Sequence, residues 1–312
     1  MLKAGVIAFG GGGLSAAASV AALLGASGGV VFAYLAPLPL LLVGLGLGSG
    51  ATAIATATGV LLVAVFGGVP AAGVYGGMHA FPSWLIVHQV MMHKPAGQAA
   101  ASRSLGSILC WLAVVGCVIA TVTAVVGRGE AGIEGSVRHL LAATTSVAAP
   151  GLTDADRDTF VGYLAPLFIG MSGVTWMLML VINGVLAQAV LARWGRNLRP
   201  TPNWSALTLP EWMAWPLVGT AAVALATGGD IGYMAHNLVL ILAAPYFFLG
   251  LAVVHSLARL APSKVFVLTT FYVALGVFFA FAGAAVVGLG VIEQWAGVRR
   301  RFVGAGPGQG SE

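Results

Sequence analysis

The chain has 312 residues, of which 59% are hydrophobic and 7% are charged, and its formal net charge is +5. No Asp, Glu, Lys or Arg lies deep inside the long apolar runs, and a lipid core keeps charges at its edges. These properties exclude a soluble globular protein and predict an all-α fold, a polytopic transmembrane helical bundle. The basic residues form short clusters instead of a stripe, so the positive charge does not indicate nucleic-acid binding.

The first half of the chain holds apolar runs of about the ~20 residues that a bilayer crossing needs. We predict spans at the ranges 5–25, 29–49, 51–67, 70–92 and 105–127. Lys3 precedes the first span, and cytoplasmic loops are enriched in Lys and Arg. The N-terminus is therefore expected in the cytoplasm, and the fourth span returns the chain there at His93 and Lys94.

The loop 128–158 mixes both signs of charge and is expected on the outer side of the membrane. Apolar residues recur at helical spacing from Ile133 to Leu141, which predicts an amphipathic helix lying on the membrane surface. Thr153 and Asp156 have the spacing of a helix-capping pair. The Asp-rich segment after Thr153 lacks the glycine and the bidentate Glu of a calcium loop, so we predict no metal site.

Three further spans are predicted at 159–191, 211–227 and 232–256, which brings the number of spans to eight. The last apolar segment, 265–295, is either a ninth span or a hairpin that turns at Gly276 or Gly283. The basic run 299–301 favours a cytoplasmic C-terminus, which the hairpin would provide. No hydrophilic stretch is long enough for a soluble domain, so residues 1–302 form one predicted membrane domain, followed by a disordered Gly-rich tail at 303–312.

The predicted spans carry a few polar or aromatic side chains that suit a solute pocket. The candidate substrate-binding residues are Trp176, Asn183, Gln188, His236 and Asn237. Membrane pockets are mostly apolar with a few placed polar groups, and Asn183 is the first candidate because it lies near the middle of its span. The alternative is that these side chains form hydrogen bonds between helices.

Two short patterns suggest more specific roles. Ala17 and Ala21 form a stripe of small residues on the first span, which is either a packing face or a docking face for another membrane subunit. Gly170-Met171-Ser172-Gly173 matches the Gly-x-Ser-Gly signature of rhomboid intramembrane proteases, in which the serine is the nucleophile. In a chain with 45 glycines such a tetrapeptide arises readily by chance, so helix packing is the favoured interpretation.

Three segments together resemble the YybS-like family of bacterial predicted membrane proteins, a domain of unknown function. They are Tyr34-Leu-Ala-Pro37-Leu-Pro39, the segment from His236-Asn237 through Pro245 to Gly250, and Gly288 to Trp295 followed by Arg299-Arg-Arg301. That family is similar to the substrate-binding S components of energy-coupling-factor transporters. The resemblance implies a helical bundle that binds a small solute and docks, through Ala17 and Ala21, onto a coupling membrane subunit with ATPases.

The sequence thus predicts a non-enzymatic transport component of the bacterial inner membrane, with no catalytic residue and no cofactor. Energy would come from partner ATPases, because the chain has no phosphate-binding Gly-x-x-x-x-Gly-Lys-Ser/Thr loop and no membrane carboxylate. One alternative is a structural or assembly protein of the cell envelope, in which the polar residues hold helices together. A minor alternative is an intramembrane serine hydrolase that uses Ser172.

Overall fold

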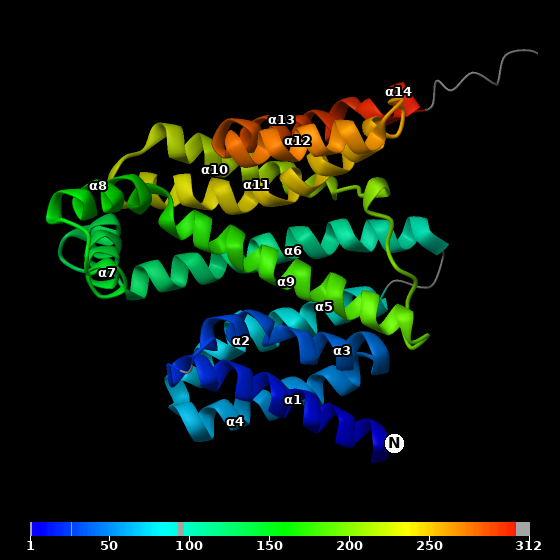
Figure 1. Ribbon diagram of the computed structural model, residues 1–312, viewed down its shortest axis with the longest axis horizontal. Coiled ribbons are helices and arrows are strands. Elements are labelled where there is room, and N and C mark those ends of the chain that lie inside the picture. The colour runs from blue at the N-terminus through cyan, green and yellow to red at the C-terminus, as the bar shows by residue number, and fades with distance from the viewer. Residues whose placement is uncertain (1, 26, 93–96, 304–312) are drawn as a thin grey trace, which may run out of the picture. The chain divides into compact units, whose positions relative to one another are not determined.

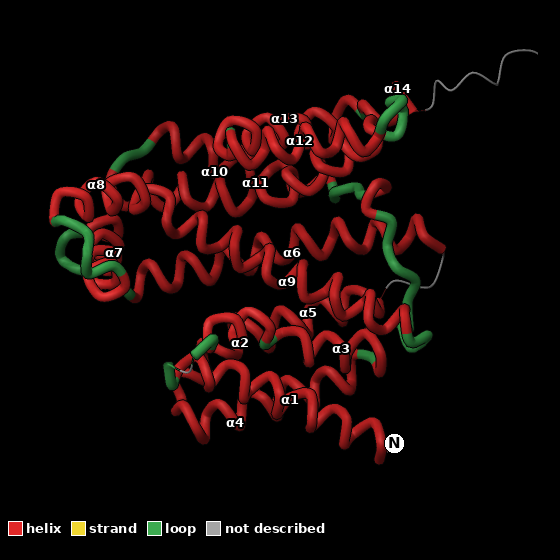
Figure 2. Tube along the Cα trace, in the orientation of Figure 1, coloured by secondary structure: helices red, strands yellow, loops and turns green. Residues whose placement is uncertain are grey.

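The computed structural model describes residues 2–25, 27–92 and 97–303, so the expected turn at His93 and Lys94 lies outside the described residues. Helices make up most of the described chain, and none of its residues belongs to a named β-strand (Figure 2). The all-α helical fold class is therefore confirmed. Of the predicted tail at 303–312 only Val303 is described, at the end of the last helix.

The chain divides into two compact units. The first unit contains Met1–Val115 and Thr175–Asn203, and the second contains Gly116–Val174 and Trp204–Glu312. The prediction of one membrane domain over 1–302 stays a prediction.

The first unit is built on small residues that let its helices approach closely. Its helices are α1 (Leu2–Leu23), α2 (Gly29–Leu35), α3 (Pro37–Leu47), α4 (Ser49–Tyr75), the π-helix η1 (Gly76–Ala80), α5 (Phe81–Met92), and parts of α6 (Gly97–Val126) and α9 (Phe168–Arg193). Figure 1 shows α1, α3 and α4 packed side by side, in blue. Their core includes Ala8, Ala16, Leu40, Ala55 and Tyr75.

The stretch from Ser49 to Met92 contains two of the predicted spans. Gly68 has φ +84°, a conformation that favours glycine, and Pro70 follows it. The chain reverses here, because the Tyr75 ring contacts Gly59, which lies on the other side of the break. The predicted boundary between 67 and 70 therefore coincides with a real turn between two helical segments.

The second unit is organised around its longest helix, α11 (Gly229–Ala258), which packs against α7, α10, α12, α13 and α14. The other elements are α7 (Gly132–Ala148), α8 (Asp154–Leu164), the short 3-10 helices η2 (Ala165–Leu167), η3 (Trp204–Ala206) and η4 (Glu211–Met213), and then α10 (Ala214–Ala226), α12 (Lys264–Val277), α13 (Phe279–Ala296) and α14 (Val298–Val303). Gly250 and Gly290 let α11 and α13 cross in close contact, because a Cβ atom on either glycine would overlap the backbone of the other helix.

Two local predictions for the second unit are confirmed. The predicted amphipathic segment forms the helix α7, which buries Ile133, Val137 and Leu141 against other helices of the second unit, although Leu140 faces outward. Its predicted position on the membrane surface stays a prediction. Thr153 is the N-cap of α8, and its hydroxyl accepts a hydrogen bond from the Asp156 N–H at 3.2 Å. Thr153 therefore caps α8, and the two aspartates in its first turn favour the helix N-terminus.

The last apolar segment is a pair of helices, with its break at Phe278 and not at Gly276 or Gly283. The Ser205 carbonyl oxygen accepts hydrogen bonds from Ser256, near the end of α11, and from Arg299, just after α13. Both ends of the α12–α13 pair therefore lie at the same end of the second unit (Figure 1), which is the hairpin arrangement. The glycines fit within helices, and the chain turns instead where Phe278 leaves the helical conformation.

Seven helical stretches among the described residues are long and apolar enough to cross a membrane. They include every predicted span except 211–227, where α10 has only 13 residues. The chain is therefore a multi-pass membrane protein, in agreement with the sequence analysis.

Candidate functional site

The polar interior of the first unit begins where the second apolar run is broken by two prolines. Pro37 and Pro39 have no N–H groups, so the backbone hydrogen bonds of α2 and α3 are interrupted. The Ala36 carbonyl oxygen accepts a hydrogen bond of 2.6 Å from the Ser15 hydroxyl, and Ser15 is also 2.7 Å from the Tyr75 hydroxyl. Neighbouring helices thus supply the polar partners that a broken membrane helix needs.

Asn183 of α9 reaches the same break. Its Nδ2 atom donates hydrogen bonds to the carbonyl oxygens of Tyr34, at 2.8 Å, and of Met179, at 2.7 Å. The residue is only 2% exposed, and its Oδ1 atom has no hydrogen-bond partner. The Nδ2 atom of this carboxamide is therefore bonded within the fold, whereas Oδ1 is a buried acceptor without a partner.

The π-helix η1 (Gly76–Ala80) lies next to this region in the fold. Trp176 donates a 2.8 Å hydrogen bond from its indole N–H to the Met78 carbonyl oxygen. The His79 ring lies 5.7 Å from the Tyr75 ring, and its Nδ1 atom is buried without a partner. π-Helices are rare and are frequently found at functional sites.

Two buried serine hydroxyls in the first unit, those of Ser19 and Ser83, also have no hydrogen-bond partner. Together with Asn183 Oδ1 and His79 Nδ1 they give four available polar atoms on α1, η1, α5 and α9. We refer to these four residues, together with Ser15 and Tyr75, as the polar cluster of the first unit. Within it, direct contacts join Ser15 to Tyr75 and Tyr75 to His79. The described residues contain no group of three His, Cys, Asp or Glu side chains that could hold a metal ion.

Gln188, a further predicted site residue, lies nearer the end of α9. Its Nε2 atom donates to the Arg199 carbonyl oxygen at 2.9 Å, and the Arg199 guanidinium binds the Met91 carbonyl oxygen at 2.9 Å. These bonds fasten the segment after α9 within the first unit. Gln188 therefore anchors a loop in this structure.

Asn237 in the second unit has all its polar groups in use. Its Nδ2 atom donates to the carbonyl oxygens of Pro166, at 3.0 Å, and Tyr233, at 2.9 Å, and its Oδ1 atom accepts from the Gly170 N–H at 2.8 Å. Gly170 lies four residues after Pro166, so the side chain bridges a donor and an acceptor at the spacing of a helical hydrogen bond. Asn237 thereby joins α11 to the broken start of α9.

His236 and Ser172 both lie on exposed faces of their helices. The His236 Nδ1 atom is 2.6 Å from the Gly232 carbonyl oxygen of its own helix, and no hydrogen bond joins Ser172 to a histidine within the described part of the chain. Gly170 and Gly173, which flank Ser172 in the rhomboid-like pattern, pack closely against Asn237 and Ile241 of α11. Helix packing accounts for both glycines.

The small-residue stripe of α1 is partly covered. Ala17 is exposed, whereas Ala21 is half-buried beside Gly29, where α2 begins. The exposed part of the stripe is the part that a partner helix could contact.

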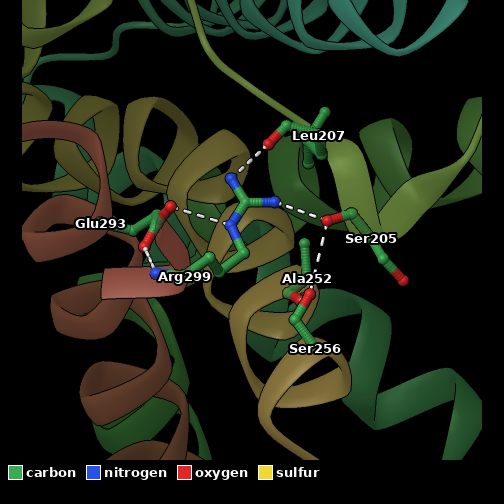
Figure 3. A network of polar contacts seen from close by, with 6 residues as sticks. All are labelled: Ser205, Leu207, Ala252, Ser256, Glu293 and Arg299. Atoms are coloured by element: carbon green, nitrogen blue, oxygen red, sulfur yellow. Dashed lines mark hydrogen bonds and ion pairs between the residues drawn. The ribbon is translucent and has the colours of Figure 1, made fainter. Parts of the chain in front are cut away.

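Arg299 and Glu293 form a buried ion pair that the sequence analysis did not identify. The Arg299 Nε atom lies 2.8 Å from Glu293 Oε1, and the two side chains are only 14% and 7% exposed. The same guanidinium donates to the carbonyl oxygens of Ser205, at 2.6 Å, and Leu207, at 2.7 Å. Figure 3 shows how this network ties the segment after Trp204 to the ends of α11 and α13.

The predicted site residues are thus divided between the two units: Trp176, Asn183 and Gln188 belong to the first, and His236 and Asn237 to the second. The sequence alone did not single out Ser15, Ser19, Tyr75 or Ser83 as site residues. The four-residue spacing of Ser15 and Ser19 places both on one face of α1 and was the available signal.

Comparison with known proteins assigns most of the chain to a family. The family model "Predicted membrane protein (DUF2232)" matches residues 15–293, which is most of the chain. No curated protein and no solved structure matches the sequence or fold.

Proposed function

This chain belongs to the predicted membrane protein family DUF2232, and we propose that it binds a small, uncharged polar solute inside its first unit. In this proposal it is the non-enzymatic, solute-binding component of a transport system in the bacterial inner membrane. The observation that carries the proposal is the polar cluster of the first unit, which contains four buried polar atoms without partners.

Buried polar groups are normally hydrogen-bonded, because an unpaired group costs about 1–3 kcal/mol. Such a cost is acceptable at a binding site, where a solute supplies the missing partners. Asn183 Oδ1 accepts hydrogen bonds, and the Ser19 and Ser83 hydroxyls both donate and accept. A solute with N–H or O–H groups fits this set of atoms.

The proposed solute is uncharged because the polar cluster consists of hydroxyl groups, an amide and an imidazole. A charged solute in an apolar interior needs an opposite charge beside it. The only carboxylate buried within the described residues is Glu293, and Arg299 neutralises it in the second unit.

The proposed energy source lies outside this chain. The sequence has no nucleotide-binding phosphate loop, so the proposed partner is a coupling membrane subunit with ATPases. The exposed Ala17 supports the proposed docking through Ala17 and Ala21, and of these two residues it is the one that a partner helix can reach. Lys3 supports a cytoplasmic N-terminus.

A second candidate function is a structural or assembly protein of the cell envelope. The observation that favours it is Asn237, whose polar atoms are all bonded to neighbouring backbone groups. If the polar cluster of the first unit serves the same purpose, no solute is bound.

The test is purification of the tagged protein in mild detergent, followed by mass spectrometry of the extracted small molecules and of the co-purifying proteins. The proposal predicts a near-stoichiometric uncharged metabolite that Asn183→Leu loses while its elution as a folded protein is unchanged. Ser172→Ala is the control, because Ser172 is exposed and takes part in no hydrogen bond within the described residues.

Three other results of these experiments would contradict the proposal or favour the structural role. A metabolite retained equally by Asn183→Leu and Ser172→Ala, or no metabolite at all, overturns the proposed site. Envelope-assembly proteins in the eluate then favour the structural role. Labelling of Ser172 by a fluorophosphonate probe would contradict the non-enzymatic assignment.

A further inference from the structure

The end of the second unit that carries the Arg299 network exposes several positive charges. The exposed cations are Arg259, Lys264, Arg300 and Arg301. The nearby carboxylate of Glu293 does not offset them, because Arg299 already pairs with it. Glu211 is the exposed carboxylate in this part of the fold, where Gln294 binds the adjacent Pro210 carbonyl oxygen. The exposed surface is therefore strongly positive.

A shallow, open groove of about 640 Å³ begins at this charged end. Its described lining lies on one face of α12 and consists of Lys264, Val265, Leu268, Thr269, Tyr272 and Val273. Lys264 is the first residue of α12, and the lining becomes mostly apolar farther along the helix.

Polar contacts hold both the groove and the charged end in place. The Tyr272 hydroxyl is 2.7 Å from His255 Nε2, which joins α12 to α11 beside the groove. Arg259 donates to the Ser205 hydroxyl at 2.7 Å, and Arg299 holds the Ser205 carbonyl oxygen. The basic side chains thus extend from a fixed end of the hairpin.

We propose that an anionic phospholipid occupies this groove. Its acyl chain would lie along Val265, Leu268 and Val273, and its phosphate would lie at Lys264, with Arg259 nearby. A positive end next to an apolar groove complements a lipid with a net negative charge. A zwitterionic phospholipid carries the same phosphate but adds a positive amine, which the neighbouring cations repel. This proposal is independent of the solute site in the first unit.

The test compares two lipids on the full-length protein. Detergent-purified protein is incubated with phosphatidylglycerol or with phosphatidylcholine of the same acyl chains, and native mass spectrometry measures the bound lipid. We expect retention of phosphatidylglycerol to exceed that of phosphatidylcholine, and Lys264→Gln to reduce the former about five-fold, which corresponds to about 1 kcal/mol per basic residue.

Two variants make the result specific. Lys3→Gln removes the same charge from an exposed position on α1 of the first unit, and it should leave retention unchanged. Leu268→Trp fills the groove without changing the charge, and it should reduce retention of phosphatidylglycerol as strongly as Lys264→Gln does. Equal retention of the two lipids, or equal effects of Lys264→Gln and Lys3→Gln, overturns the proposal. Displacement of the lipid by millimolar inorganic phosphate would also overturn it, because the site would then recognise phosphate alone.

Discussion

Two asparagines in apolar helices, Asn183 in the first unit and Asn237 in the second, form the same kind of hydrogen bonds through Nδ2 but differ at Oδ1. Each donates from Nδ2 to the carbonyl oxygen four residues earlier and to a carbonyl oxygen near a proline break. Asn237 also accepts a hydrogen bond at Oδ1, from Gly170, whereas Oδ1 of Asn183 has no partner. A buried amide therefore indicates a binding site only if one of its polar atoms has no hydrogen-bond partner within the fold.

The largest expected effect belongs to the buried ion pair of the second unit. Arg299→Met leaves the Glu293 carboxylate buried without its partner and should lower the free energy of unfolding by about 3 kcal/mol. Reversible unfolding in mixed micelles measures this loss. The double variant Arg299→Met with Glu293→Leu should recover most of it, and a double variant as unstable as the single one would contradict this account.

The next effect tests Asn237 itself. Asn237→Leu removes three hydrogen bonds and leaves the Gly170 N–H and the Pro166 carbonyl oxygen without this partner. We expect a loss of about 2 kcal/mol, since bonds between membrane helices contribute roughly 0.6 kcal/mol each and unpaired groups add to the cost. The same unfolding assay measures this loss. A loss smaller than that of Asn183→Leu would contradict the difference between the two asparagines described above.

Asn183→Leu should cost less, about 1 kcal/mol, because it removes two hydrogen bonds but also removes an unpartnered acceptor. Unfolding is measured after the protein has been freed of small molecules, so that bound solute does not add to the apparent stability. A solute that binds at Asn183 should raise the stability of the unsubstituted protein and not that of the variant. Equal stabilisation of both would place the solute elsewhere.

The smallest effect concerns a single hydroxyl in each unit. Ser83→Ala removes a buried hydroxyl without a partner, so it should leave the free energy of unfolding unchanged or raise it by up to about 0.5 kcal/mol. The cost of the unpaired group disappears, and a small loss of packing offsets part of this gain. Ser256→Ala is the matched variant in the second unit, where the hydroxyl donates to the Ala252 carbonyl oxygen at 2.7 Å, and it should cost about 1 kcal/mol. Similar losses for the two serines would mean that Ser83 does have a partner in the membrane.

The sequence predicted the helices better than the contacts between them, for a physical reason. Long apolar runs determine where membrane helices occur, and Thr153 caps α8 through residues only three positions away. The Asn183 and Trp176 bonds instead join residues 149 and 98 positions apart, which periodicity does not report. Likewise, Arg299 in a basic cluster gave no sign that it turns inward to Glu293.

Hydroxyl side chains also made the site residues difficult to predict from the sequence. Thr58, Thr121 and many other threonines donate to the carbonyl oxygen four residues earlier in their own helix. A hydroxyl in an apolar run is therefore usually satisfied locally and carries no functional signal. Ser15 differs because it bonds to Ala36 and Tyr75 on other elements, and only the fold shows this.

The α12–α13 hairpin has a consequence for the surrounding lipid. Its first arm has 14 residues and is about 21 Å long, which is shorter than the ~30 Å hydrocarbon core. Its turn exposes Phe278, Phe279 and Phe281, which are apolar and suited to the acyl chains. Hydrophobic mismatch of this kind thins the bilayer locally or leaves the turn inside it, so the hairpin takes more area from one leaflet than from the other. Membrane thickness and leaflet asymmetry therefore act directly on this part of the chain.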